Sequence, residues 1–178
     1  MNQQTNTDPL EASRQFLRGF SQHYDYDITY LEDLMDASPG AFQAFDAAMA
    51  MGRYQKAAPT DLLMIAGIAT TRFEDCGPCL ELGLKMAAEQ GVPQDVIRGA
   101  LHGGQGLQPE YLDIYHYARA VAANEEMDPE LLPRLKARWG KEVVAELALI
   151  IVASRLYPTL KRALGHAQSC SLTPGLLS

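Results

Sequence analysis

The chain has 178 residues, of which 47% are hydrophobic and 21% are charged, and its formal net charge is −7. A chain of this length buries roughly 70% of its unfolded surface, so we expect a single domain over residues 1–178. The acidic balance argues against binding to nucleic acid or to an anionic membrane, because contacts with phosphate require clustered Lys and Arg.

Three further features of the sequence favour a cytoplasmic location. Residues 1–7 are polar and lack the apolar stretch of a signal peptide. The longest purely apolar run, 147–153, is far shorter than the ~20 residues of a membrane span. Three cysteines do not form the even set of a secreted disulfide framework. We therefore expect a cytoplasmic protein that does not interact with a membrane.

Residues that start helices, and apolar positions at helical spacing, predict helices along most of the chain. Pro158 falls inside the last predicted helix, where we expect a kink. No run alternates between apolar and polar residues as a strand would, so we predict an all-α fold. Residues 1–7 and 166–178 are expected to be terminal tails. The predicted helices cover about 9–24, 28–36, 42–54, 60–73, 77–89, 93–101, 109–123, 129–139 and 141–164.

The predicted helix at 60–73 is apolar almost all round between Leu62 and Ala69. A helix that is hydrophobic on every side is typical of the interior of a bundle, so we expect this helix to be central. It leads directly into the Cys-Gly-Pro-Cys segment at 76–79, which begins the next predicted helix.

Cys76 and Cys79 are three positions apart at the predicted start of a helix. Residues i and i+3 of a helix lie roughly 5–6 Å apart, within the Cα separation of about 4.4–6.8 Å that a disulfide requires. The unpaired N–H groups of a helix N-terminus also favour a thiolate. This pattern indicates a dithiol/disulfide redox centre, and half of a metal site or inert structural cysteines are the alternatives.

Two carboxylates stand directly before this pair. Glu74 and Asp75 precede Cys76, and a nearby negative charge raises the pKa of a thiol. This effect opposes that of the helix N-terminus, and the sequence alone does not decide which of the two is larger.

An all-helical chain in which an apolar helix leads into a CxxC helix resembles the carboxymuconolactone decarboxylase / alkylhydroperoxidase D-like superfamily. The resemblance covers roughly residues 40–165, including the later segments 111–123 and 139–155. It implies an alkylhydroperoxidase D-like helical bundle that assembles into a homo-oligomer, as a dimer, trimer or hexamer. It also implies peroxidase or disulfide reductase activity, in which Cys79 attacks the substrate and Cys76 resolves the product as a disulfide.

The same resemblance implies the reaction partners. The substrate is expected to be a small-molecule peroxide or disulfide, and a dithiol reductant protein is expected to restore the thiols. Neither a cofactor nor a metal is expected, and the sequence does not identify the physiological oxidant or reductant.

The sequence departs from the fuller motif of the family at three positions. Met64 stands where the family has a Glu, and Pro78 and Gly83 stand where it has His. In the family, these groups form the proton relay that activates the thiol. A replacement for the relay therefore has to come from other residues.

Two residues are candidates for that replacement. Asp61 lies one turn before Met64 on the same face of its predicted helix, with capping of the first turn as the alternative. His102 ends a later helix and is a candidate base for Cys79, with a surface or capping role as the alternative. Gly83 costs about 1 kcal/mol relative to Ala inside a helix, so it either leaves room for a substrate or another side chain, or permits tight helix packing.

We therefore predict a thiol-dependent oxidoreductase. One alternative is a non-catalytic or redox-sensing oligomeric protein, which the missing relay favours. A lactone decarboxylase-type enzyme is another, but no convergent acid/base set is visible for it. His166 and Cys170 could also join the CxxC pair in a Cys₃His zinc site. Cys-Gly-Pro-Cys is also the thioredoxin motif, but that fold requires strands on either side of it, and we predict helices there.

Overall fold

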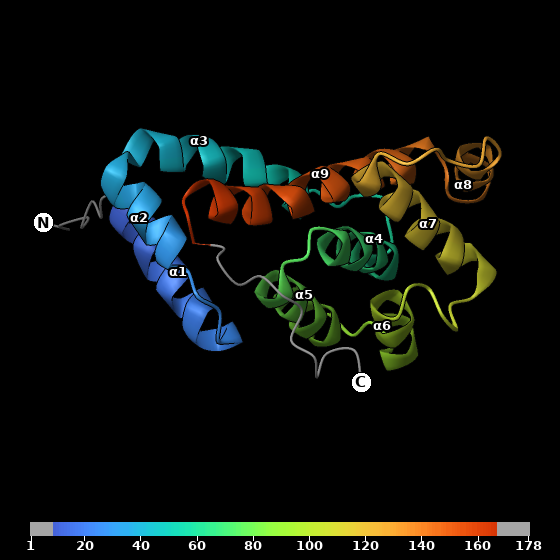
Figure 1. Cartoon of the computed structure of the whole chain (residues 1–178), viewed down its shortest axis with the longest axis horizontal. Helices are drawn as coiled ribbons and strands as arrows, with labels where there is room; N and C mark the ends of the chain where they lie inside the picture. Colours follow the sequence, from blue (N-terminus) through green and yellow to red (C-terminus); the bar gives the residue numbers. More distant parts are fainter. Residues whose placement is uncertain (1–8, 167–178) are drawn as a thin grey trace, which may run out of the picture. The chain divides into compact units, whose positions relative to one another are not determined.

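The computed structural model describes residues 9–166. Within that range the chain forms helices joined by turns, without a strand (Figure 1). The predicted all-α class is therefore confirmed, and a thioredoxin fold is excluded. The elements are α1 (Pro9–Tyr24), α2 (Thr29–Ala37), α3 (Pro39–Met49), the 3₁₀ helix η1 (Ala50–Arg53), α4 (Thr60–Phe73), α5 (Gly77–Glu89), α6 (Gln94–Leu101), α7 (Pro109–Ala123), α8 (Leu131–Trp139) and α9 (Lys141–Ala163).

The observed helix bounds lie close to the predicted ones, and those of α4 coincide with them. The largest difference is in the third helix, where α3 ends at Met49 and the chain tightens into the 3₁₀ turn η1. Helix α9 is continuous through Pro158, so the kink stays a prediction. The tails expected at 1–7 and 166–178 lie outside the described residues, except for His166.

The contacts between residues divide the chain into two compact units, the first ending at Ala48 and the second beginning at Met49. The single domain expected from the chain length therefore stays a prediction. In the first unit, α1 has no buried residue, and the ion pair between Arg18 and Glu32 joins it to α2. The buried residues of α2 are Tyr30, Leu31 and Met35.

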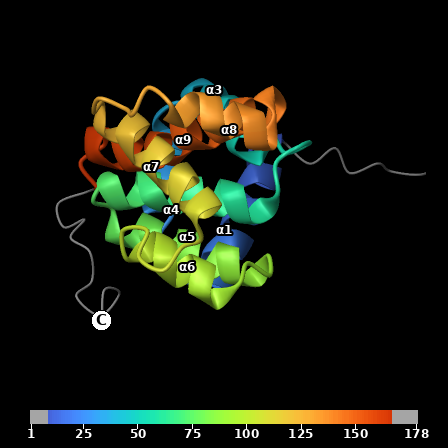
Figure 2. The same cartoon turned by 90° about the vertical axis from the view of Figure 1, so that its right-hand side faces the viewer.

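Helix α4 is the centre of the second unit. It contacts α5, α6, α7 and α9, which surround it in both views (Figures 1 and 2). Its central position agrees with the prediction from its apolar sequence. The buried residues of α4 are Leu62, Leu63, Ile65, Ala66, Ile68, Ala69, Thr70 and Thr71.

Helix α9 packs along α4 and is the longest helix of the described chain. By length and composition alone it could cross a membrane, with a mean hydropathy of 1.7 over an 18-residue window that is 39% buried. The core helix of a globular protein passes the same test. Here α9 contributes Val143, Leu147 and Ile151 to the core around α4.

A buried carboxylate of α9 fixes the loop that leads into α4. Glu146 accepts hydrogen bonds from the backbone N–H groups of Lys56, Ala57 and Ala58, at 3.0, 2.9 and 2.9 Å. Burial raises the pKa of this carboxyl, but the three N–H donors outweigh that effect and hold its pKa below the ordinary value. Glu146 thus stays charged and fixes where α4 begins.

Candidate redox site at the start of helix α5

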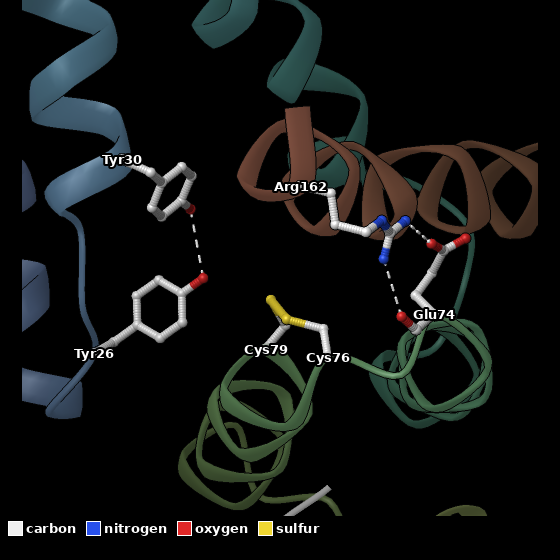
Figure 3. The surroundings of a disulfide bond; sticks show 6 residues. All are labelled: Tyr26, Tyr30, Glu74, Cys76, Cys79 and Arg162. Carbon is white, nitrogen blue, oxygen red and sulfur yellow. Dashed lines mark hydrogen bonds and ion pairs between the residues drawn. A yellow bond between two sulfur atoms is a disulfide. The ribbon is translucent and has the colours of Figure 1, made fainter. Parts of the chain in front are cut away.

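The two cysteines lie at the junction between α4 and α5. Cys76 is the N-cap residue of α5, and Cys79 lies in the first turn. A disulfide joins them, with their Cα atoms 5.3 Å apart (Figure 3). The chain turns sharply before them because Asp75 adopts a left-handed backbone, with φ of 51°. The N–H of Leu80 donates to the carbonyl of Cys76 at 2.8 Å and closes the first turn.

The two cysteines differ in exposure. Cys76 is fully buried, with 0% of its surface exposed, whereas Cys79 is half-buried. Cys76 is at the N-cap of α5 and Cys79 is in its first turn, and a helix N-terminus favours negative charge on sulfur. Cys79 is therefore the residue of the pair that is partly open to solvent, and Cys76 is the one that is shielded from it.

The charge of Glu74, which the sequence places two residues before Cys76, is neutralised in the structure. Its side chain is only 5% exposed and accepts from Nε of Arg155 at 2.6 Å and from Nη2 of Arg162. Nη1 of Arg162 also donates to the backbone carbonyl of Glu74 at 3.1 Å (Figure 3). Two positive charges thus offset the carboxylate, so it disfavours a thiolate less than the sequence suggested.

These bonds also hold the redox loop in place. Arg155 and Arg162 are seven residues apart on α9 and therefore share one face of that helix. Together they tie the loop between α4 and α5 to α9, through both the side chain and the backbone of Glu74. This three-residue cluster of Glu74, Arg155 and Arg162 is called the Glu74 cluster below.

Asp61 lies in the first turn of α4, far from the disulfide. Its carboxylate accepts a hydrogen bond from the hydroxyl of Tyr111 on α7, and this bond raises the pKa of Tyr111 to about 12. The length of α4 from Asp61 to Phe73 is about 18 Å at 1.5 Å per residue. The structure therefore does not bring Asp61 to the sulfur atoms.

His102 follows the last residue of α6 and is partly buried. Its backbone N–H donates to the carbonyl of Arg98 at 2.9 Å, which ends the helix. Within residues 9–166 its imidazole makes no hydrogen bond, so it is not joined to either sulfur. In the described part of the chain, His102 is the C-cap residue of α6 and has no hydrogen bond to Cys79.

Gly83 lies one turn beyond Cys79 on α5 and has open space beside it. A Cβ atom added there would meet no described atom within 4 Å. Tight helix packing therefore does not explain this glycine, and the space suits the first alternative, room for a substrate or for another side chain. Met64, the other relay position, packs against the core as a partly buried side chain.

A cavity of about 580 Å³ lies between α5 and α6 and is lined by equal numbers of apolar and polar or charged side chains. Its α5 residues include Glu81, Leu84, Lys85 and Ala88. At 100° per residue, these positions lie on the side of α5 opposite to Cys79. The cavity therefore lies on a different side of α5 from Cys79.

No group of three or more His, Cys, Asp or Glu residues that could hold a metal occurs in the part of the chain that the structure describes. His166 is exposed, and Cys170 lies outside that part. The alternative of a Cys₃His zinc site therefore falls partly outside the described residues.

The Glu74 cluster and Glu146 are the polar groups that sequence reasoning missed. For each of them, the sequence holds one pattern that indicates a buried or shared position. Glu146 falls within the apolar stripe of α9, and Arg155 and Arg162 are spaced to share one face of it. Neither signal names a partner, because the bonds span 81 to 90 residues of sequence.

Comparisons with known proteins add no assignment. No family model matches the chain, and neither a curated protein nor a solved structure matches it. The case for a function therefore rests on the residues described above.

Proposed function

We propose that the protein is a thiol-dependent oxidoreductase that reduces a small-molecule peroxide or disulfide with the Cys76/Cys79 pair. One observation carries the proposal. The two sulfurs are joined at the N-terminus of α5, and Cys79 is partly exposed while Cys76 is buried. A reversible dithiol needs this arrangement, since one sulfur must meet the substrate and the other must wait for the product.

With a hydroperoxide, the reaction has two steps. The Cys79 thiolate attacks the outer oxygen, the O–O bond breaks, and the alkoxide leaves as an alcohol after taking a proton. Cys79 is then a sulfenic acid. The Cys76 thiolate attacks its sulfur, the S–O bond breaks, and hydroxide leaves as water after taking a proton. The disulfide that forms is reduced again by a dithiol protein, through a mixed disulfide.

The assignment of Cys79 as the attacking thiol has two supports. Its exposure exceeds that of Cys76, and the resemblance to the alkylhydroperoxidase D-like superfamily implies the same order. The resemblance also supports a homo-oligomer, with the open space at Gly83 as a place for a side chain from a second copy. These assignments are part of the proposal.

Turnover by cysteine variants tests the proposal. Reduced protein is given a hydroperoxide and a dithiol donor, and peroxide consumption is followed. We expect Cys79→Ser to lower turnover about a thousandfold or more, as the loss of a nucleophile does. Without the donor, whose thiols would themselves resolve a sulfenic acid, Cys76→Ser should consume about one equivalent of peroxide and end with Cys79 as a sulfenic acid, whereas the unaltered protein should end as the disulfide. Cys170→Ser is the matched control and should leave turnover unchanged. If the double Cys76/Cys79 variant consumes peroxide as fast as the unaltered protein, the proposal fails.

A redox sensor is the second candidate, and the burial of Cys76 favours it, together with the absence of the relay at Met64 and Gly83. A sensor forms the disulfide with an oxidant but is regenerated slowly. Multiple turnovers with a dithiol donor support the enzyme, whereas a single oxidation per chain under the same conditions supports the sensor.

A further inference from the structure

We propose that the end of α4 holds a binding site for a small oxyanion, a carboxylate or phosphate group, and that Arg72 is its main donor. Arg72 lies in the last turn of α4, and both Tyr115 of α7 and the turn after α6 lie against it. The site and its test are independent of the proposed thiol chemistry.

The guanidinium of Arg72 has more donors than partners. Its Nη1 atom donates to the hydroxyl of Tyr115 at 3.1 Å. Its Nε atom is buried and has no hydrogen-bond partner among residues 9–166, and no carboxylate in that range forms an ion pair with Arg72. Nη2 also has no partner there and, unlike Nε, is open to solvent. A buried donor without an acceptor is destabilising, so a ligand that supplies the acceptor is favoured.

The two unpaired nitrogens share one edge of the guanidinium. The N–H groups of Nε and Nη2 point the same way and form a planar fork, whereas Nη1 lies on the other side. The two oxygens of a carboxylate or phosphate match such a fork, each accepting one hydrogen bond. An oxyanion that reaches Nη2 from solvent therefore brings its second oxygen towards Nε. Tyr115 binds the one nitrogen that this ligand does not need.

The polar group next to Arg72 is also a donor without an acceptor. Tyr115 is only 3% exposed, and its hydroxyl oxygen accepts from Arg72. The proton of that hydroxyl has no acceptor in the described part of the chain. Donors thus outnumber acceptors around the guanidinium. This imbalance favours a ligand that only accepts hydrogen bonds, as an ionised carboxylate or phosphate does.

The turn after α6 adds no side chain beside the guanidinium. Gly103 has a φ of 79°, a left-handed backbone that favours glycine. A Cβ atom at this position would lie 3.7 Å from Nη1 of Arg72 and 3.9 Å from the hydroxyl of Tyr115. The backbone of the turn therefore comes close to both donors, and glycine leaves the space beside them free.

Arg72 is partly ordered before a ligand arrives. An arginine loses side-chain freedom when it binds an anion, and part of that loss is already incurred because the buried Tyr115 holds Nη1. The chain as a whole carries a net charge of −7, so it repels anions in general. Saturable binding of an oxyanion therefore requires local donors of this kind.

Two other arginines provide controls. All three side-chain nitrogens of Arg134 on α8 are bonded to carboxylates, Nε and Nη2 to Asp113 and Nη1 to Asp128. Arg98 on α6 is exposed, and its side chain has no partner among residues 9–166. Arg134 thus represents a paired arginine, and Arg98 represents an unpaired arginine on an exposed surface.

The experiment follows the arginine Nε–H signals of the ¹⁵N-labelled full-length protein by NMR. The variants Arg72→Lys, Arg98→Lys and Arg134→Lys assign the three signals by their loss. Inorganic phosphate and acetate are the probes, and sodium chloride at equal ionic strength is the blank. We expect the Arg72 signal to shift saturably with at least one probe beyond its shift in chloride. The signals of Arg98 and Arg134 should move no more than they do in chloride.

Calorimetric titration with the same probe gives the size of the effect. Arg72→Lys keeps the charge but loses the fork, and we expect it to weaken binding about tenfold or more, as the loss of a hydrogen bond to a charged group does. Arg98→Lys and Arg134→Lys should change the affinity by less than about twofold, since exposed charges are screened by salt. Circular dichroism checks that the compared proteins are folded.

A saturable shift with phosphate alone assigns the site to a phosphate group, a shift with acetate alone assigns it to a carboxylate, and a shift with both assigns it to either oxyanion. An Arg72 signal that moves with neither probe beyond its shift in chloride overturns the inference. An equal loss of affinity in Arg98→Lys overturns it as well. The titration of the unaltered protein remains decisive where Arg72→Lys is too unstable for calorimetry.

Discussion

The two ends of α4 are both held to α9 by a buried carboxylate, but in different ways. Before α4, Glu146 of α9 accepts only from backbone N–H groups, those of Lys56, Ala57 and Ala58. After α4, the direction is reversed, because Glu74 of the loop accepts from arginine side chains of α9.

The two carboxylates differ in the kind of donor that they bind. At the start of α4, the partners of Glu146 are the main-chain N–H groups of Lys56, Ala57 and Ala58. The side chains of Arg155 and Arg162 at the other end are each 44% exposed. The first carboxylate is therefore a structural cap, while the second ties two partly exposed arginine side chains of α9 to the loop that precedes Cys76.

The largest effect is expected on stability at the Glu146 end. Glu146→Gln replaces a charged acceptor of three buried bonds, and hydrogen bonds to charged groups contribute about 1.5–3 kcal/mol. We expect a loss of about 2 kcal/mol in the free energy of unfolding by urea. Glu142→Gln, an exposed site on the same helix, is the control and should cost well under about 1 kcal/mol. Equal losses in the two variants would contradict the assignment of Glu146 as a cap.

The same stabilisation should depend on pH with a defined sign. The pKa of Glu146 in the folded chain lies below its ordinary value of 4.5. The charged carboxyl therefore stabilises the fold above pH 4.5, and this contribution is lost as the pH falls through the folded pKa. The difference in stability between the unaltered protein and Glu146→Gln should be constant near neutral pH and shrink below 4.5. A difference that grows on acidification would reverse the sign and refute the assignment.

A smaller stability effect, with a change in thiol chemistry, is expected at the other end. Glu74→Gln should cost about 1 kcal/mol, because its arginine partners are exposed enough for solvent to screen the pair. It also removes one negative charge beside the cysteines, so alkylation of the reduced protein by a neutral reagent near pH 7 should be about two- to fivefold faster. Glu146→Gln should leave that rate unchanged. Slower alkylation in Glu74→Gln would break the distinction between the two ends.

The smallest effect on the thiols is expected from Asp61, which shares the Glu146 end of α4. Asp61→Asn should change the alkylation rate by less than about twofold, since α4 separates it from the cysteines. Its effect should appear instead in the absorbance titration of tyrosine, where the pKa of Tyr111 should fall from about 12 towards 10. Because that pKa is raised, the Tyr111 bond stabilises the fold below pH 10, and this contribution is lost between 10 and 12. A clear fall in alkylation rate would instead place Asp61 in the thiol site.

Local signals in the sequence predicted the helices well. A proline near a helix start, a glycine after its end and apolar spacing are read within one or two turns, and α4 has its predicted bounds. The 3₁₀ turn at Ala50–Arg53 was missed because it continues the pattern of α3 with a small change in hydrogen bonding. The helix predicted over 141–164 with Pro158 inside it agrees with α9, which runs from Lys141 to Ala163.

At the candidate site, the sequence predicted only the contacts between residues that are close together in the chain. Cys76 and Cys79 pair within one helical turn, so their spacing sufficed. The Glu74 cluster depends on bonds across 81 and 88 residues, which follow from the packing of α9 and not from any motif. The same limit explains Asp61 and His102, which were chosen by helix face and helix end, while their actual partners lie on other elements or in the backbone.

The most direct measurement is a redox titration of the folded Cys170→Ser protein against dithiothreitol buffers, with the helical circular dichroism followed in parallel. The account predicts one reversible two-electron transition, with a tenfold change in the ratio of reduced to oxidised protein for about 30 mV. The helix content should stay unchanged throughout. Cysteines that become reducible only when the helices unfold would contradict it.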